Sequence, residues 1–527
     1  MVKINIDDKK YEVDAGTTIL DATKKAGIEI PTMCYLKGIS NQASCMLCVV
    51  KNCDNGELLT SCAVKAEEGM NISTKDKEIF EARKSALELL LSDHVGDCEA
   101  PCRIACPLFL QIPAMNRNFA ANNFDYTLKV IKEEIAFPLI MCRICSAPCE
   151  KVCRRRQVDT PISIRETVSL ISSENLKSYK NFKLEKEFNK NKKIAIVGAG
   201  LSGLGCAYHL LQKAYDCTIF EKNEKAGGSL MEFSEEEMPE SLLETEIENL
   251  KINGAKFVFN QKIDGQRIEN LKNEFDIILI ANGSAFNFLE KETISKNIRK
   301  IDNNKPIFYK NDKKVVVCSS VFQNKEKLVK ILALAKNTAT VVDSLFIEKK
   351  TNSYARFFNS KFGNLREHEI NEYLKETEIG IGERKKTEPT KQISKNEIMA
   401  EAQSCMSCDC RKPVSCKLRI YSNQYDAKQR KYGFGERKSL QKYFEHPDIV
   451  FEPEKCIKCG LCIKIAKKNA EKTGLSFFGR GFDMKVDIPF DRAINEAITK
   501  SAEECVEVCP TGAISDKAFF ENKNRIS

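Results

Sequence analysis

The chain has 527 residues, of which 42% are hydrophobic and 30% charged, and its formal net charge is +9. This length is too great for a single hydrophobic core and predicts several domains, while the composition is ordinary for a soluble globular protein. The basic residues are scattered and form no patch interleaved with aromatic residues, so we expect no nucleic-acid partner.

The sequence also predicts the compartment. No apolar run is long enough to cross a bilayer, and the N-terminus alternates like a strand and lacks the apolar stretch of a signal peptide. We therefore expect a cytoplasmic protein with no membrane span, in a compartment that keeps thiols reduced. Twenty-four cysteines in that compartment indicate metal ligands rather than disulfides.

Residues 1–78 are predicted to form a first domain of two strands, a helix and a Cys-rich loop. The helix begins after Thr17 or Thr18 and ends at Gly27. The loop contains a close cysteine pair flanked by two more thiols, which is the ligand pattern of a [2Fe–2S] centre, with zinc as the alternative. These ligands are Cys34, Cys45, Cys48 and Cys62. The pattern resembles the ferredoxin domain of the large iron–sulfur subunit of respiratory complex I and related hydrogenases, which implies a β-grasp fold. Ala43 stands where that family usually has glycine.

Residues 79–178 are predicted to form a helical domain. An amphipathic helix leads to His94, which precedes two cysteine runs: Cys98, Cys102 and Cys106, then Cys142, Cys145, Cys149 and Cys153. The histidine resembles a [4Fe–4S] ligand of the complex I subunit. The two runs resemble the cluster domain of the glutamate synthase small subunit and dihydropyrimidine dehydrogenase, which implies two [4Fe–4S] clusters.

The same resemblance implies how these eight ligands are divided. In that family's pattern one cluster is held by His94, Cys98, Cys102 and Cys153, and the other by Cys106, Cys142, Cys145 and Cys149. The relatives usually have cysteine where this chain has His94, so the division between the two clusters stays open.

Residues 190–348 are predicted to form a Rossmann-like domain. A strand enters a helix through Gly198, Gly200 and Gly203, whose missing side chains let a pyrophosphate approach the helix N-terminus. A second strand ends at Glu221, which is placed to accept a hydrogen bond from a ribose. The segment again resembles the glutamate synthase small subunit, which implies FAD and adds Gly227, Gly228 and Gly283 to its binding residues.

The NADPH domain of that family has no counterpart in this chain. The family inserts it after the position of Gly283, but the stretch before the strand at residues 313–317 is too short to contain it. Ser319 and Ser320 then replace a Gly-Asp pair whose aspartate normally touches the flavin. Whether FAD is retained, or the domain is a scaffold that has lost its flavin, is therefore left open.

Residues 349–445 are interpreted as a linker with a metal-binding segment. Its thiols, which suit a [4Fe–4S] cluster, zinc or no metal, are Cys405, Cys408, Cys410 and Cys416. Residues 446–527 are predicted to form a [4Fe–4S] ferredoxin-like domain that resembles complex I. Its ligands are Cys456, Cys459, Cys462 and the remote Cys509. Ala466 replaces the local fourth cysteine of bacterial ferredoxins, so this domain can hold one cluster, and Cys505 is a spare.

The chain is thus expected to be a multidomain α+β and α/β protein, in which a flavin region splits a complex I-like module. We expect one [2Fe–2S] cluster, three [4Fe–4S] clusters, a fourth if Cys405–Cys416 holds one, and FAD. No general base or nucleophile is arranged for substrate chemistry: His209 lies on the Rossmann helix, and His368 and His446 lie in charged, surface-like stretches.

These expectations favour an electron-transfer subunit of a multisubunit oxidoreductase of the NAD(P)H-linked hydrogenase, formate dehydrogenase or electron-bifurcating type. Its expected partners are an NAD(P)H-dehydrogenase-type flavoprotein, a hydrogenase or formate dehydrogenase-type catalytic subunit, and ferredoxin. A self-sufficient NAD(P)H-dependent oxidoreductase of the glutamate synthase small-subunit type is the main alternative, and a zinc-bearing interaction scaffold is a third.

Overall fold

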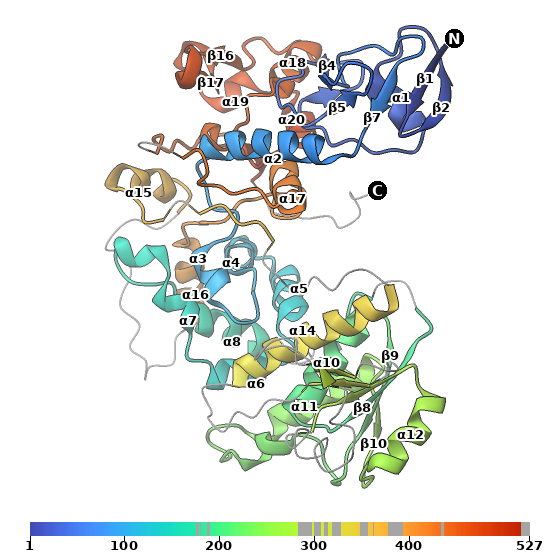
Figure 1. The fold of residues 1–527 in the computed structure, drawn as a ribbon. Helices are drawn as coiled ribbons and strands as arrows, with labels where there is room; N and C mark the ends of the chain where they lie inside the picture. The colour runs from blue at the N-terminus through green and yellow to red at the C-terminus, as the bar shows by residue number, and fades with distance from the viewer. Residues whose placement is uncertain are drawn as a thin grey trace. The chain divides into compact units, whose positions relative to one another are not determined.

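Two compact units make up the fold, each of them discontinuous in sequence. The computed structural model describes residues 1–174, 179, 181–186, 190–282, 298–299, 307–309, 315–318, 328–347, 357–361, 363–377, 394–433 and 437–517. Unit 1 contains Met1–Ala100, Arg356–Gly380 and Met406–Ser527. Unit 2 contains Pro101–Ala355 and Ile381–Cys405. Figure 1 follows the chain by colour, with both the blue N-terminal and the red C-terminal elements belonging to unit 1.

Unit 1 begins with a mixed five-stranded sheet covered by one helix. Its strands, in the order β2-β1-β7-β5-β6, are β1 (Val2–Ile6), β2 (Lys9–Val13), β5 (Val49–Asn52), β6 (Leu58–Thr60) and β7 (Asn71–Ser73). Strands β1 and β7 pair in parallel, and the other pairs are antiparallel. Helix α1 (Ile19–Lys25) begins at Thr18, whose hydroxyl accepts the Asp21 N–H at 3.1 Å, as the sequence predicted. A small hairpin, β3 (Tyr35–Leu36) and β4 (Ser40–Asn41), leads into the Cys-rich loop.

Helix α2 (Lys77–Ser92) joins this sheet to the C-terminal part of unit 1, as Figure 1 shows. Asp76 caps its N-terminus by accepting the Ile79 N–H at 2.8 Å. The buried Arg83 then donates to the Val49 carbonyl at 2.8 Å and to the Tyr425 hydroxyl at 3.1 Å. These bonds tie α2 to strand β5 and to the segment that follows α17.

The C-terminal part of unit 1 is a small α+β fold. Its helices are α15 (Glu367–Leu374), α17 (Lys417–Gln424), η5 (Pro453–Lys455), α18 (Leu461–Lys468), η6 (Gly481–Asp483), η7 (Pro489–Asp491), α19 (Ile494–Ala497) and α20 (Ala502–Val508). Its antiparallel strand pairs are β15 (Ile449–Phe451) with β18 (Ile514–Asp516), and β16 (Ser476–Phe478) with β17 (Lys485–Asp487). His446, which we expected at the surface, is buried because its Nε2 lies 3.1 Å from the Ile498 carbonyl oxygen.

The first part of unit 2 is helical. Its elements are α3 (Pro101–Ala105), α4 (Ile112–Ala120), α5 (Phe124–Glu134), α6 (Pro138–Ile144), α7 (Pro148–Lys151), η1 (Arg154–Gln157), α8 (Ile164–Glu174) and the late α16 (Lys395–Gln403). Helix α16 begins with a capping box between Ser394 and Glu397 and packs against α4 and α8. Glu401 of α16 accepts the Ser163 N–H at 2.8 Å, which joins two segments far apart in the sequence.

The second part of unit 2 is a Rossmann-like sheet. Its described strands, in the order β10-β9-β8-β11-β14-β13-β12, are β8 (Lys193–Val197), β9 (Asp216–Phe220), β10 (Lys256–Val258), β11 (Ile277–Ile280), β12 (Ile298–Arg299), β13 (Ile307–Tyr309) and β14 (Val315–Val317). Strands β8–β11 and β14 pair in parallel, and β12 and β13 add an antiparallel edge.

Helices cover this sheet and join it to the helical part of unit 2. They are α10 (Leu201–Gln212), η2 (Gly228–Glu232), α11 (Glu240–Ile252), α12 (Gly265–Glu274) and α14 (Leu328–Ile347). Helix α14 approaches α10 so closely that a Cβ on Gly205 would lie 2.7 Å from Leu332 Cδ2. One continuous apolar core runs through both parts of unit 2. Helix α6, which carries Cys142, packs against α11 and α14, two of the helices that cover the sheet.

Candidate metal centres and nucleotide site

The four cysteines of the first domain converge in its buried loop. The Sγ atoms of Cys34 and Cys45 are 3.4 Å apart, and those of Cys48 and Cys62 are 3.3 Å apart. The S–H of Cys45 lowers the pKa of Cys34 to about 5, and the S–H of Cys62 lowers the pKa of Cys48 to about 7. Each pair therefore stabilises one thiolate, the form that binds metal.

Ala43, which stands where the resembling family usually has glycine, has a backbone conformation typical of glycine. Its φ is +54°, in the left-handed region that glycine adopts without strain. The backbone has therefore kept the glycine-like conformation although a side chain is present.

Four cysteines of the C-terminal domain line one small enclosed cavity. They are Cys456, Cys459, Cys462 and Cys509. The Lys458 N–H donates to the Sγ of Cys456 at 3.2 Å, which favours a thiolate there. Burial has the opposite effect and raises the pKa of Cys456 to about 12. A bound cation would offset this effect and stabilise the thiolate. The spare Cys505 donates its S–H to the Cys462 carbonyl at 3.7 Å.

A third group in unit 1 combines residues from both ends of the inserted region. The Cys410 N–H donates to the Cys98 carbonyl at 3.3 Å, and the Ser360 N–H donates to the Cys98 Sγ at 3.3 Å. Burial, together with the nearby Cys410, raises the pKa of Cys98 to about 12. Burial also raises the pKa of Cys416, and the thiols of Cys410 and Cys98 raise it further.

His94 precedes Cys98 in this region and is half-buried, with its Nδ1 atom shielded from solvent. Burial lowers its pKa to about 4, and its Nδ1 has no hydrogen-bond partner among the described residues. A neutral imidazole with an unpartnered buried nitrogen has the chemistry of a metal ligand. The buried Lys455, which pairs with Glu452 at 2.5 Å, supplies the nearest positive charge.

Ligand residues of all three groups share one apolar core in unit 1. Cys34 and Cys45 of the first group, Cys459 of the second and Cys416 of the third pack together with Met33, Leu47, Leu87, Leu91, Ile457 and Leu461. The three groups are therefore neighbours and not isolated sites.

Unit 2 contains a further set of seven thiols, packed against its core. They are Cys102, Cys106, Cys142, Cys145, Cys149, Cys153 and Cys405. Four of these influence one another electrostatically in a chain that runs from Cys142 through Cys145 to Cys106 and Cys149. This is the set that the family pattern implied for one of the two central clusters.

The predicted metal-binding segment of residues 405–416 is divided between the units. Cys405 ends unit 2, where Arg155 donates to the neighbouring Ser404 carbonyl at 3.0 Å. Cys408, Cys410 and Cys416 belong to unit 1. Sequence spacing missed this division, because it reflects tertiary packing of α16 that no local pattern records.

A single metal ion would need ligands that meet at one point. Within the described residues, no three His, Cys, Asp or Glu side chains converge in that way. Ligands of an iron–sulfur cluster instead surround a group of several iron and sulfide ions, so they stand farther apart than the ligands of one zinc ion.

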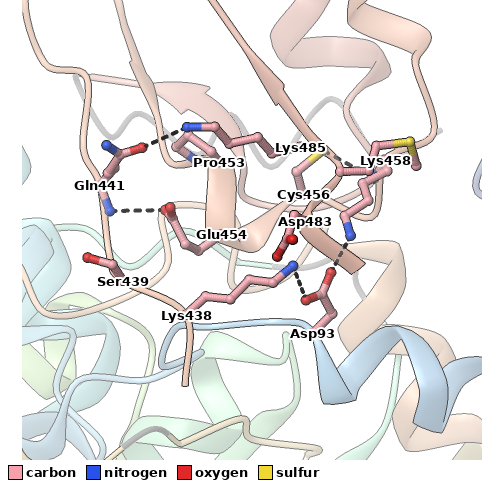
Figure 2. A pocket seen from close by; sticks show the side chains of 11 residues that line it. Asp93, Lys438, Ser439, Gln441, Pro453, Glu454, Cys456, Lys458, Asp483 and Lys485 are labelled. Atoms are coloured by element: carbon pink, nitrogen blue, oxygen red, sulfur yellow. Dashed lines mark hydrogen bonds and ion pairs between the residues drawn. The ribbon is translucent and has the colours of Figure 1, made fainter. Parts of the chain in front are cut away.

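An open pocket of about 290 Å³ lies beside the cavity of the C-terminal domain (Figure 2). Lys438 and Lys458 both point to the carboxylate of Asp93, with Lys458 at 2.6 Å, and Cys456 forms part of the wall. Glu454 accepts the Gln441 N–H at 3.1 Å, and burial raises the pKa of Glu454 to about 7. The pocket therefore brings solvent next to a candidate cluster ligand.

In the turn between β8 and α10, positions 198 and 203 fit only glycine. A Cβ on Gly203 would lie 1.9 Å from the Gly198 carbonyl oxygen, and Gly198 itself has φ +107°. Gly200 begins α10, whose N-terminus has no side-chain cap, so its N–H groups are available to an anion. These residues fit a dinucleotide pyrophosphate.

Glu221 and the second glycine pair complete this turn. The buried Glu221, directly after β9, accepts the Ala199 N–H at 2.8 Å and the Asn223 N–H at 3.0 Å with its carboxylate. Gly227 donates to the Ala199 carbonyl at 2.9 Å, and a Cβ on Gly228 would lie 3.0 Å from the Gly200 Cα. Gly283, Ser319 and Ser320 lie outside the described residues.

Four family models match separate parts of the chain. They are a 2Fe-2S iron-sulfur cluster binding domain at residues 1–77, dihydropyrimidine dehydrogenase domain II with a 4Fe-4S cluster at 73–178, an NAD(P)-binding Rossmann-like domain at 196–250, and the ferredoxin-like domain of NADH-quinone oxidoreductase subunit 3 at 446–515. The chain is therefore a multidomain iron–sulfur protein with a Rossmann-like domain. The resemblances to the complex I and dihydropyrimidine dehydrogenase families are confirmed.

Similar proteins are subunits of redox enzymes. The NADPH-Fe(3+) oxidoreductase subunit beta of Geobacter sulfurreducens is 30% identical over 242 residues, covering 44% of this chain and 36% of the relative. The NADP(+)-dependent formate dehydrogenase subunit beta of Moorella thermoacetica is 29% identical over 207 residues, covering 35% and 29%. The NADP-reducing hydrogenase subunit HndD of Solidesulfovibrio fructosivorans is 37% identical over 165 residues, covering 29% and 28%. The chain thus spans about a third of these relatives' length or less.

No helix in the described part of the chain combines the length and the apolar character that crossing a bilayer requires.

Proposed function

We propose that this chain is an electron-transfer subunit of a multisubunit oxidoreductase that relays electrons among iron–sulfur clusters and FAD. The observation that carries the proposal is the shared apolar core of unit 1, in which Cys34, Cys416 and Cys459 come from three different thiol groups. Iron–sulfur clusters exchange single electrons, and a flavin exchanges one or two. Closely packed ligand groups keep each transfer step short.

The geometry supports a ligand assignment for unit 1. We propose a [2Fe–2S] cluster on Cys34, Cys45, Cys48 and Cys62, within the β-grasp fold that the mixed sheet supports. A [4Fe–4S] cluster is assigned to Cys456, Cys459, Cys462 and Cys509. A second [4Fe–4S] cluster is assigned to His94, Cys98, Cys410 and Cys416. The contact between Cys98 and Cys410 favours this last set over the division that the family pattern implied.

Unit 2 is assigned one complete ligand set and one partial set. The complete [4Fe–4S] set is Cys106, Cys142, Cys145 and Cys149. The thiols left in unit 2 are Cys102, Cys153 and Cys405, which could hold a fourth [4Fe–4S] cluster with one further donor. Because residues 405–416 are divided between the units, an iron–sulfur role for these thiols has more support than a single zinc site.

The Rossmann-like domain is assigned to FAD. Gly198, Gly200 and Gly203 would receive the pyrophosphate at the N-terminus of α10, and Glu221 would accept a hydrogen bond from a ribose hydroxyl. Glu221 is held in place for this by its two backbone N–H donors. Gly227 and Gly228 keep the adjoining loop close to the turn.

The source and acceptor of the electrons are proposed to lie on partner subunits in the cytoplasm. The relatives' names include NADPH-Fe(3+) oxidoreductase, formate dehydrogenase and hydrogenase subunits, and the sequence contains one dinucleotide glycine fingerprint. An NAD(P)H-dehydrogenase-type flavoprotein, a hydrogenase or formate dehydrogenase-type subunit, and ferredoxin are the proposed partners.

The second candidate is a self-sufficient NAD(P)H oxidoreductase, which the NAD(P)-binding description of the Rossmann-like family favours. Anaerobic stopped-flow mixing of the reconstituted chain with NADPH or NADH separates the two. The relay proposal predicts that neither nucleotide bleaches the chromophores quickly, whereas dithionite bleaches them fully. Rapid flavin reduction by either nucleotide would establish the second candidate instead.

A further inference from the structure

The loop from Cys106 to Leu110 folds its backbone back onto the Cys106 thiol. The N–H groups of Leu108 and Leu110 act as hydrogen-bond donors to the Cys106 Sγ. The Phe109 N–H donates to the Cys106 carbonyl at 3.0 Å, which closes the loop. Burial raises the pKa of Cys106, and the Leu110 and Leu108 N–H groups oppose this rise. The loop therefore favours the thiolate, the form that binds iron.

Phe109, between the two donors, has a strained backbone. Its φ is +58°, in the left-handed region that bulky residues rarely adopt. The residue is 40% exposed, so packing of its ring does not account for the strain. N–H groups on either side of a left-handed residue can converge on one anion. The strain therefore lies where it turns the Leu108 and Leu110 donors toward the thiol.

Side chains from outside the loop hold its carbonyl groups. The buried Lys336, on α14, donates from Nζ to the Leu108 carbonyl at 2.8 Å and also pairs with Glu134 at the end of α5. Arg103, on α3, donates from Nε to the Phe109 carbonyl at 3.3 Å. These two bonds hold the peptide groups before and after Phe109. Lys336 provides the shorter bond, and it comes from the Rossmann-like domain.

Helix α14 connects this loop with the nucleotide turn. It packs against α10, where a Cβ on Gly205 would lie 2.7 Å from Leu332 Cδ2 and 3.0 Å from Ala335 Cβ. The Cys206 Sγ of α10 also donates to the Ala335 carbonyl at 3.6 Å. Lys336 directly follows Ala335 in the sequence. One turn of α14 therefore contacts both the helix that begins at the glycine turn and the ligand loop.

We propose that Lys336 is a positioning residue that sets the N–H···S hydrogen bonds on Cys106, and thereby the reduction potential of the [4Fe–4S] cluster assigned to this cysteine. The inference rests on the proposed relay function and its ligand assignment. Hydrogen bonds to the ligand sulfurs stabilise the reduced cluster, which is more negative by one electron. Without the Lys336 donor, the peptide group before Phe109 can rotate, and the strained φ is lost. The N–H groups then turn away from the sulfur, and the cluster becomes harder to reduce.

A redox titration of the full reconstituted chain, followed by EPR, tests this role. The cluster in question is the [4Fe–4S] signal that Cys142→Ser removes. Lys336→Met is expected to lower the midpoint potential of that signal and to leave the potentials of the other clusters at their wild-type values. Lys330→Met is the matched control, because it removes an exposed ammonium group from the same helix, and it is expected to change no potential.

A second variant separates positioning from a direct effect of charge. Glu134→Gln removes the negative charge beside Lys336 but keeps the donor to the Leu108 carbonyl, so positioning predicts the wild-type potential. A raised potential in Glu134→Gln would show that charge alone governs the cluster and would overturn the proposal. Amide hydrogen exchange of the peptide that contains Leu108 and Leu110, measured by mass spectrometry, is expected to be about tenfold faster in Lys336→Met and unchanged in Glu134→Gln.

The iron and sulfide content of the wild-type protein tests the relay function separately. A reconstituted chain that holds no cluster on Cys106 would contradict both the ligand assignment and the role of Lys336. A loaded chain in which Lys336→Met changes neither the potential nor the amide exchange would overturn the positioning role alone and leave the relay function standing.

Discussion

The amide N–H of Cys410 donates a hydrogen bond to the carbonyl oxygen of Cys98 at 3.3 Å. These cysteines precede and follow all the residues of unit 2, and residues 356–380 between them also belong to unit 1. The thiol of Cys98 also accepts the Ser360 N–H at 3.3 Å. A complex I-like ligand group can therefore be completed by residues on both sides of the insertion.

The Cys98–Cys410 relationship predicts that both residues serve the same cluster. We expect Cys98→Ser and Cys410→Ser each to remove the iron and sulfide of one [4Fe–4S] cluster, because each removes one of its ligands. The double variant should lose no more than either single variant. Iron and sulfide analysis with EPR of the reduced protein measures this, and Cys53→Ser, at an exposed thiol outside the ligand sets, is the control. Additive losses in the double variant would assign the two cysteines to different clusters.

Substitutions at two glycines of the Rossmann-like turn are predicted to have different effects on stability and on flavin binding. A Cβ at position 203 would collide with the Gly198 carbonyl oxygen, so Gly203→Ala should destabilise unit 2 as well as abolish flavin binding. At Gly200 a Cβ meets no protein atom within 4 Å, so Gly200→Ala should keep the thermal stability and lose only the flavin. Calorimetry and flavin content separate the outcomes, and equal flavin content in Gly200→Ala and wild-type protein would argue against a pyrophosphate at this turn.

Glu471 predicts a pH dependence for the C-terminal domain. Burial raises its pKa, but hydrogen bonds from Thr499, Lys500 and Ser501 outweigh this and hold the pKa at about 2. Because the pKa is lower in the folded state than in the unfolded state, the carboxylate stabilises the fold above about pH 4.5, and this contribution is lost as the pH falls to about 2.

Replacement of this carboxylate should reproduce the acid effect at neutral pH. Glu471→Gln is expected to lower the free energy of unfolding by about 1–2 kcal/mol at pH 7, and by progressively less as the pH falls toward 2. Urea unfolding at several pH values measures the difference. A difference between the variant and wild-type protein that stays constant from pH 7 to pH 2 would contradict the assignment. Glu507→Gln, in the segment after Ala502, is a charge-matched control.

A buried ion pair in unit 2 predicts coupling between packing and cluster retention. Lys132 and Glu246 are both buried, 3.7 Å apart, and Glu246 also accepts the Leu139 N–H at 3.0 Å and the Tyr179 hydroxyl at 2.6 Å. Leu139 lies in the first turn of α6, the helix that carries Cys142, so Glu246→Ala should destabilise unit 2 by about 3–5 kcal/mol and lower its cluster content.

The double variant Lys132→Met/Glu246→Leu provides the control for this pair. It removes both charges and so leaves no unpaired buried charge, although the Leu139 N–H and the Tyr179 hydroxyl still lose Glu246 as their acceptor. We therefore expect it to be less destabilised than Glu246→Ala. Thermal unfolding of the reconstituted variants measures the order. A double variant less stable than the single variant would show that the pair itself, and not the unpaired charge, governs stability.

Local patterns predicted much of the fold. Thr18 begins its helix as expected because a cap is a contact within one turn, and Glu221 directly follows its strand because the βαβ unit is a local motif. His446 differs: its charged neighbours suggested the surface, but a tertiary hydrogen bond to Ile498 buries it.

The candidate ligand groups divide in the same way. The groups closed by nearby residues, such as Cys34 with Cys45, follow from spacing because a short loop brings them together. Spacing does not predict that Cys98 lies beside Cys410, or that Cys405 belongs to unit 2. Each of these depends on how α16 and the insertion pack. No spacing rule spans an inserted domain.

The measurement that tests the central claim most directly is EPR of the fully reduced chain over a range of temperatures. If the ligand groups of Cys34 and Cys459 hold neighbouring clusters in one core, the [2Fe–2S] signal should show enhanced relaxation and magnetic broadening. Both effects should disappear in Cys456→Ser. A sharp [2Fe–2S] signal that is the same in wild-type protein and Cys456→Ser would contradict the relay.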